Sequence, residues 1–206
     1  MNRHTTGFLM LAFTLLAGQV ALAAPGEPEQ LIRSTTEEVL GTMQERKRSG
    51  QRDDSASERL VKEKILPIIE FESFAKLTLG RHWRDATPEQ RRRFTGEFES
   101  MLVRTYAKYL WDYADTRVSY LPTRQDGKYV FVSQELAPGQ GKTPLRVEYR
   151  FKNFNGDWRA IDVEVDGLSL VKNFRTSFVD EVNQAGLDAL ITRLATANEP
   201  IGASAP

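Results

Sequence analysis

Residues 145–165 read LRVEYRFKNFNGDWRAIDVEV, and their side chains alternate between apolar and polar. In the first half the apolar residues fall on one face, and arginine and glutamate fall on the other. In the second half Ile161, Val163 and Val165 share one face in the same way. A period of two is that of a β-strand, and Asn155-Gly156 between the halves is a strong hairpin signal. The stretch therefore predicts two antiparallel strands with one covered and one solvated face.

Two further strands are expected upstream of this stretch. Residues 118–120 alternate until Pro122, and residues 129–136 form another strand-like run. Asp126-Gly127 lies between them and is a second hairpin signal. Short strands joined by tight turns predict a four-stranded antiparallel meander, which we expect to end at Asp166-Gly167.

Helical periodicity dominates the remainder of the chain. Apolar residues recur at helical spacing over residues 27–47, 57–66, 68–80, 87–113, 174–186 and 187–194. Pro67 is expected to bend or break the helix at that point. In the longest segment Thr87 can cap the helix, Pro88 suits its first position, and Gln90 completes a capping box. The expected fold class is α+β, with helices packed on the concave face of a curved four-stranded antiparallel sheet.

The first 23 residues have the features of a cleaved signal peptide. A weakly basic start precedes an apolar run over residues 8–16, and Ala21-Leu22-Ala23 supplies the small-x-small cleavage pattern. The run is shorter than the ~20 residues of a spanning helix, which favours cleavage over a retained anchor. Gln19 stands where a lipoprotein would need a cysteine. We expect an exported chain of one domain that starts near Ala24, with a disordered tail from about residue 199.

Composition narrows the possible chemistry. The 206 residues include 28 Lys plus Arg, 28 Asp plus Glu and no Cys. Without cysteine, thiol catalysis, disulfides and Cys-ligated metal sites are excluded. The balanced charge argues against nucleic acid as a partner. An exported chain without disulfides fits a bacterial periplasm, where disulfides are permitted but not needed.

The ionisable residues form no recognisable catalytic or metal site. His82 is the only histidine after the signal peptide, and no local acid or nucleophile accompanies it. Asp53-Asp54 lies in a polar loop and is expected to be solvated rather than to bind metal. The run Arg91-Arg92-Arg93 favours a solvated helix face, although contact with an anionic headgroup or a partner protein stays open. Asp162 is the nearest acid for an isomerase cavity, but the alternation places it on the face opposite Val163.

A large set of apolar side chains is expected to meet between the sheet and the helices. The set comprises Phe94, Phe98, Met101, Leu102 and Tyr106 from the long helix, Val130, Val132, Val147, Tyr149, Phe151, Ile161, Val163 and Val165 from the strands, and Phe174 and Phe178 from the late helix. Ligand pockets are themselves mostly apolar. The periodicity therefore leaves two alternatives, a filled core and an open cavity.

Two blocks of the sequence resemble the MlaC-type periplasmic phospholipid-binding proteins, also called toluene-tolerance proteins. The first is residues 158–178, WRAIDVEVDGLSLVKNFRTSF. The second is residues 79–90, LGRHWRDATPEQ, followed by Phe94 and Phe98. The resemblance runs in the same order from about Glu29 to Leu194. It implies a sheet and helices that enclose an apolar cavity, similar in outline to the NTF2-like fold.

The resemblance also implies a periplasmic lipid carrier without a cofactor, not an enzyme. Such proteins move phospholipid between an outer-membrane lipoprotein–porin complex and an inner-membrane ABC transporter with an MCE-domain protein, which maintains the lipid asymmetry of the outer membrane. The apolar set would then bind the acyl chains of a diacyl phospholipid, with the headgroup in solvent and weak headgroup selectivity. A cavity-type isomerase, another binder of hydrophobic ligands and an interaction module with a solid core are the alternatives.

Overall fold

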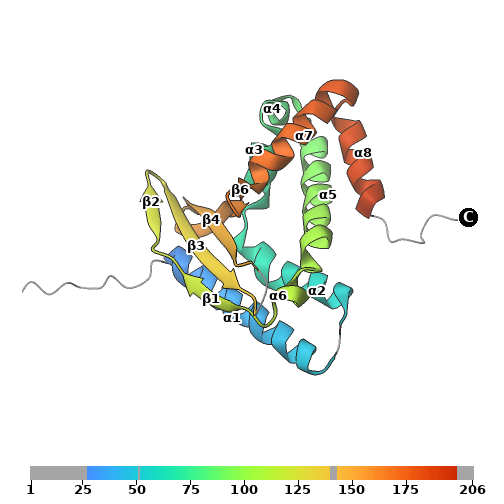
Figure 1. Cartoon of the computed structure of the whole chain (residues 1–206). Coiled ribbons are helices and arrows are strands. Elements are labelled where there is room, and N and C mark those ends of the chain that lie inside the picture. The colour runs from blue at the N-terminus through green and yellow to red at the C-terminus, as the bar shows by residue number, and fades with distance from the viewer. Residues whose placement is uncertain (1–26, 51, 140–142, 199–206) are drawn as a thin grey trace, which may run out of the picture.

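The computed structural model describes residues 27–50, 52–139 and 143–198, so the expected signal peptide and tail lie outside the described residues. A sheet and α1 form one side of the molecule, and the other helices gather around α5 (Figure 1). The helices are α1 (Glu27–Arg48), α2 (Asp54–Leu60), α3 (Phe71–Leu79), α4 (His82–Asp85), α5 (Pro88–Ala107), α6 (Leu110–Tyr113), α7 (Leu170–Ala185) and α8 (Leu187–Asn198). None of the helices in these ranges has the length and apolar character needed to cross a membrane.

The sheet is antiparallel, as expected, but within the described residues it has six strands rather than four. They are β1 (Arg117–Tyr120), β2 (Arg124–Asp126), β3 (Tyr129–Ala137), β4 (Leu145–Phe154), β5 (Asp157–Val165) and β6 (Leu168–Ser169). Their order is β1-β3-β4-β5-β6, and β2 also pairs with β3. Asp166-Gly167 does not end the sheet, because both residues have positive φ and turn the chain into β6.

A β-bulge interrupts the alternation that was expected in β5. Tyr149 pairs with Val163, but two residues further along β4 Phe151 pairs with Ala160. Ile161 is the extra residue and has no partner in the ladder. A bulge of this kind bends its strand and shifts the faces by one residue. The prediction that Ile161 follows the alternation of Val163 is therefore wrong.

The convex face of the sheet carries charged residues. Arg150 forms an ion pair with Asp162 at 3.6 Å. The Asp162 carboxylate also accepts hydrogen bonds from the Ser169 hydroxyl at 2.7 Å and from the Val171 backbone N–H at 3.2 Å. Asp162 thus holds the start of α7 against β5. This confirms that Asp162 points away from the concave face.

The largest hydrophobic core lies among α3, α5, α7 and α8 and is built from phenylalanine rings. Phe98 is at its centre, fully buried, and its ring centroid lies 5.3–5.8 Å from those of its neighbours Phe71, Phe74, Phe94, Phe174 and Phe178. Such ring pairs contribute about 0.5–1.5 kcal/mol each beyond the area that they bury. This cluster holds the N-terminal half of α5 rigidly in the helical layer.

A second core joins α1 to the concave face of the sheet. Ile32 of α1 packs there with Val132, Phe151 and Ala160 of three neighbouring strands. The helix therefore covers only part of the concave face. The part farther along β4, towards Leu145, is left for other elements to face.

The chain between α2 and α3 is not the pair of helices that the sequence predicts. After α2 comes a π-helical turn (Val61–Ile65) and then a 3₁₀ turn (Leu66–Ile68) that contains Pro67. Ile69 is extended and bridges to Ala160 of β5. The expected helix over residues 68–80 is therefore wrong in its first turn, because Pro67 removes a backbone donor and the chain pairs with the sheet instead.

The long helix expected over residues 87–113 begins as predicted but is divided. The Thr87 side chain accepts from the Gln90 backbone N–H, and the Gln90 side chain accepts from the Thr87 N–H, which confirms the capping box. α5 ends at Ala107, and the backbone N–H of Tyr109 donates to the carbonyl of Tyr106 three residues earlier. This tighter turn redirects the chain into α6, which a continuous apolar stripe does not predict.

Candidate functional site

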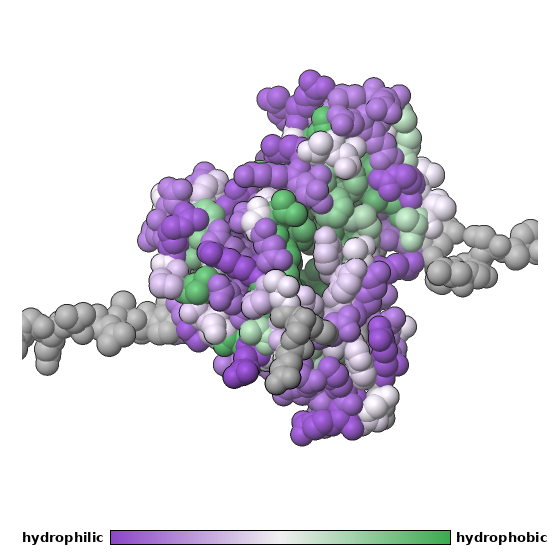
Figure 2. All heavy atoms as spheres, in the orientation of Figure 1, coloured by the Kyte–Doolittle hydropathy of each residue, from purple (hydrophilic) through white to green (hydrophobic). Residues whose placement is uncertain are grey.

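An apolar cavity lies between the concave face of the sheet and the helices opposite it. Figure 2 shows hydrophobic side chains inside a hollow on one face of the molecule. The cavity volume is about 380 Å³, which lies in the range of pockets that hold small organic ligands. Its lining residues are Val61, Ile65, Leu66, Ile69, Phe71, Phe74, Leu102, Val103, Tyr106, Tyr109, Leu110, Tyr113, Leu136, Leu145, Val147, Tyr149, Val163, Val165 and Leu170.

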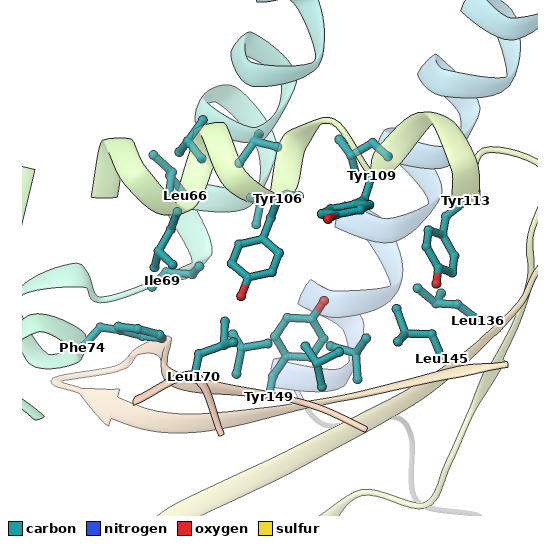
Figure 3. A pocket seen from close by; sticks show the side chains of 18 of the residues that line it. Leu66, Ile69, Phe74, Tyr106, Tyr109, Tyr113, Leu136, Leu145, Tyr149 and Leu170 are labelled. Carbon is teal, nitrogen blue, oxygen red and sulfur yellow. The ribbon is translucent and has the colours of Figure 1, made fainter. Parts of the chain in front are cut away.

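The two walls of the cavity come from elements far apart in the sequence. One wall is the sheet, where Leu145, Val147 and Tyr149 of β4 alternate toward the cavity. The other wall runs from the C-terminal end of α5 to α6, and this segment contributes Tyr106, Tyr109 and Tyr113 (Figure 3). The π-helical turn closes a further side with Val61. π-Helical turns are rare and often lie at functional sites.

The lining is uncharged. It contains no aspartate, glutamate, histidine, lysine or arginine among the described residues. Its polar side-chain atoms are tyrosine hydroxyls, and every other lining side chain is a hydrocarbon. Such a surface can bind hydrocarbon by excluding water, and it offers neither a carboxylate nor an imidazole for proton transfer.

One tyrosine is held in place by a chain of hydrogen bonds behind the cavity. The Thr36 hydroxyl donates to Oε1 of Gln134 at 3.1 Å, and Nε2 of Gln134 donates to the Tyr149 hydroxyl at 3.4 Å. Gln134 is buried. Burial raises the pKa of Tyr149 to about 12, despite the opposing effect of the Gln134 hydrogen bond. The Tyr149 hydroxyl is therefore neutral at physiological pH and keeps its proton.

Two other tyrosines lie where the cavity meets solvent. The side chains of Tyr106 and Tyr109 line the cavity and are nevertheless 38% and 48% exposed. Burial raises the pKa of Tyr106, and neighbouring Tyr109 raises it further. The Lys108 ammonium lies 5.3 Å from the Tyr109 ring centroid. These residues form the rim, which is aromatic on the inside and carries a cation on the outside.

The structure brings only part of the predicted apolar set into this cavity. The lining includes Leu102, Tyr106, Val147, Tyr149, Val163 and Val165. Phe94, Phe98, Met101, Phe174 and Phe178 belong to the phenylalanine core, while Val130, Val132 and Phe151 pack in the core beneath α1. Ile161 is buried at the bulge. The eight residues of the two cores lie outside the lining because other side chains already cover them. Ile161 lies outside it because the bulge shifts its position on the strand.

Several lining residues were missed from the sequence. Tyr109 and Tyr113 continue the apolar stripe of the long helix, and Leu136 and Leu145 end the alternating strands, so the periodicity could have found them. Val61 carries no such signal, because its place in the wall depends on the π-helical turn.

The described part of the chain contains no group of three or more His, Cys, Asp or Glu side chains that could hold a metal ion. Asp53 instead has a structural contact, because its side chain caps α2 by accepting from the Ala56 backbone N–H at 3.1 Å. Asp53 therefore contributes to the fold as the N-cap of α2.

Comparison with known proteins identifies the family. The model of the family described as MlaC protein matches residues 33–196. The chain belongs to the MlaC family. Similar members include the toluene tolerance protein ttg2D of Pseudomonas putida, which is 28% identical over 87% of this chain and 82% of its own length. The intermembrane phospholipid transport system binding protein MlaC of Haemophilus influenzae is 23% identical over 94% of each chain.

A solved structure of similar fold extends the comparison. It is that of the phospholipid-binding protein from Ralstonia solanacearum in complex with a phospholipid. The two structures superpose with a TM-score of 0.75 at 27% sequence identity, over 83% of this chain and 96% of the other. The MlaC fold of this chain, with helices on a curved antiparallel sheet, is thus shared with a protein that was captured with its lipid.

Proposed function

We propose that this MlaC-family chain binds phospholipid by enclosing acyl chains in the apolar cavity, and that it carries the lipid through the periplasm. The observation that carries the proposal is a cavity open to solvent whose lining is uncharged. The lipid bound to the relative from Ralstonia solanacearum supports the same ligand class. The lining residues, among them Leu102, Val147 and Val163, are proposed to contact the hydrocarbon.

The energetic need for such a cavity follows from the solubility of lipid tails. Each acyl CH₂ costs about 0.8 kcal/mol to expose to water. Two long chains therefore face a penalty on the order of 20 kcal/mol when a lipid crosses an aqueous space alone. Burying the charged headgroup without an ionic partner is costly, and the lining supplies none, so the headgroup would remain outside the rim at Tyr106 and Tyr109. Few contacts to the headgroup would make headgroup selectivity weak.

The proposal includes the route of the lipid. The relative from Haemophilus influenzae is named as the binding protein of an intermembrane phospholipid transport system. By analogy, we propose that this chain exchanges phospholipid with an inner-membrane MCE-domain ABC transporter and with an outer-membrane lipoprotein–porin complex, and so maintains outer-membrane lipid asymmetry. The N-terminal signal sequence would deliver the chain to the periplasm and be removed there, leaving one lipid-binding domain. Docking onto each complex would depend on charged surface patches.

A direct test uses protein that has been purified from the periplasm without detergent. Native mass spectrometry is expected to show a complex with phospholipid, and the delipidated protein is expected to extract phospholipid from vesicles. Both results support a carrier. A ligand-free protein that also fails to extract lipid would overturn the proposal and favour an interaction module with a solid interior.

A further inference from the structure

Four tyrosine hydroxyls interrupt the hydrocarbon lining of the cavity, and the Tyr149 hydroxyl is the one that a hydrogen bond within the described residues holds in place. It projects from β4 into the space between the sheet and α5, where Tyr106 faces it from the opposite wall (Figure 3). A polar group in such a place is costly unless it is hydrogen-bonded. Valine or leucine, which line the rest of this wall, would bind hydrocarbon without that cost. Gln134 supplies one partner for this hydroxyl, as a donor to its oxygen, so the remaining question is which group accepts its proton.

The hydrogen bonds behind Tyr149 determine which role its hydroxyl can take. The Gln134 Oε1 atom accepts from Thr36, which leaves the Gln134 amide nitrogen directed at the phenol oxygen. The phenol oxygen thus accepts from Gln134, and its own proton remains to be donated. In the hydrogen bonds given for the described residues, the phenol oxygen accepts from Gln134 and its proton is not donated. A phenol is protonated at neutral pH, so Tyr149 presents to the cavity a donor whose orientation Gln134 helps to fix.

The chemistry of the partner follows from the location of this donor. The wall around Tyr149 consists of hydrocarbon side chains such as Val147 and Val163, and the lining holds no cation that could balance a negative charge. A ligand group that accepts from Tyr149 is therefore expected to be neutral and attached to hydrocarbon. In a diacyl phospholipid the ester carbonyls are such acceptors, and they join the acyl chains to the headgroup. Tyr149 faces Tyr106, which lies at the rim, so the junction between chains and headgroup would sit just inside the opening.

We infer that the Tyr149 hydroxyl, positioned by Gln134 and Thr36, donates a hydrogen bond to an ester carbonyl of the bound lipid. The cavity thereby selects ester-linked acyl lipids over ether-linked alkyl lipids of the same chain length. Tyr149 is a specificity-determining residue in this role, and Gln134 is a positioning residue. The inference rests on the proposed function and adds a chemical preference to it.

The test compares two phosphatidylcholines of equal chain length, one with ester linkages and one with ether linkages. Each competes with a fluorescent lipid for the delipidated full chain. Wild-type protein is expected to bind the ester about tenfold more tightly, which corresponds to about 1.4 kcal/mol and is typical of one hydrogen bond. Tyr149→Phe is expected to bind both lipids equally. Tyr129→Phe is the matched control, because it removes a tyrosine hydroxyl from the same sheet but outside the lining, and it should keep the preference.

Each outcome bears on the inference. Equal binding of ester and ether by the wild type, or a preference that persists in Tyr149→Phe, would overturn the role of Tyr149 and leave the carrier function intact. Loss of the preference in both Tyr149→Phe and Tyr129→Phe would also overturn it, because the effect would then not be specific to the hydroxyl inside the cavity. Failure of the wild type to bind either lipid would overturn the proposed function and this inference with it.

Discussion

Placing a carboxylate in the cavity should abolish lipid binding while leaving the protein folded. Val163 is suited to this test because it lies on β5 opposite Tyr149 and its side chain lines the cavity. In lipid-free Val163→Glu the cavity is open to solvent, so water can hydrate the introduced carboxylate. When acyl chains enter, that water must leave, and the lining offers no cation in its place. The cost therefore falls on binding and not on folding.

The magnitude of this effect follows from the desolvation of one charge. Removing an ion from water without a partner costs several kcal/mol in real proteins, after relaxation. Since about 1.4 kcal/mol is a factor of ten, we expect the affinity for phospholipid to fall at least a hundredfold. The introduced carboxyl would be protonated more readily in the lipid-bound state. Its pKa would be higher there than in the lipid-free state, so the affinity should rise again as the pH falls toward about 5.

The assay is extraction of fluorescent phospholipid from vesicles, with far-ultraviolet circular dichroism as the test of folding. Leu168→Glu is the matched control, because it introduces the same charge on the adjacent strand β6, where Leu168 is 70% exposed and outside the lining. Val147 lies on β4, where it pairs with Val165 of β5 and lines the cavity, so Val147→Glu should behave like Val163→Glu. The reasoning is refuted if folded Val163→Glu binds lipid within threefold of wild type, or if Leu168→Glu loses binding equally.

Three further predictions concern stability. Phe98→Ala should lower the free energy of unfolding, measured in urea, by about 3–5 kcal/mol. The amount of lipid that each folded molecule binds should stay unchanged, and loss of lipid binding by the folded variant would contradict this. Asp162→Ala should lower the free energy of unfolding by about 1–3 kcal/mol, because it leaves buried donors and Arg150 without their acceptor. The control Asp157→Ala removes an exposed carboxylate and should lower it by less than about 1 kcal/mol. Equal losses in the two variants would show that the Asp162 contacts are unimportant. The hydrogen bond from Arg33 is the main cause that holds the pKa of Glu29 below its usual value. That contribution to stability is present above the unfolded pKa of Glu29 and is lost as the pH falls through its lower folded pKa. The free energy of unfolding of Glu29→Gln in urea should therefore depend less on pH below about 4.5 than that of wild type. Identical pH profiles of the two proteins would contradict this prediction.

The local features of the fold could be predicted because short-range physics decides them. The capping box at Thr87 satisfies backbone donors within one helical turn. The Asn155-Gly156 turn forms because both residues accept positive φ. The bulge at Ile161 was not predictable in the same way, because it depends on how β5 bends to receive the start of α7 and the bridge from Ile69.

The cavity could be predicted only in part, because core and cavity use the same residue types. Phe94, Phe98, Leu102 and Tyr106 follow one another at intervals of four on a single face of α5. The first two are fully buried among phenylalanine rings, Leu102 borders both regions, and Tyr106 lies at the rim. What changes along this stripe is the element opposite. Periodicity specifies which face of the helix is covered, but it contains no information about how closely the opposing element approaches that face.

The same stripe explains how the protein keeps an apolar cavity without collapsing it. A helix with one apolar face would normally settle onto the sheet and fill the space, because burial is favourable at every point. Here the first half of α5 is fixed by Phe98 and its ring neighbours, and the turn at Tyr109 redirects the chain before it reaches the sheet. The core thus acts as a rigid support that holds Tyr106 away from Tyr149. Stability and binding are thereby assigned to different ends of one helix, which is why substitutions at Phe98 and Val163 should separate the two.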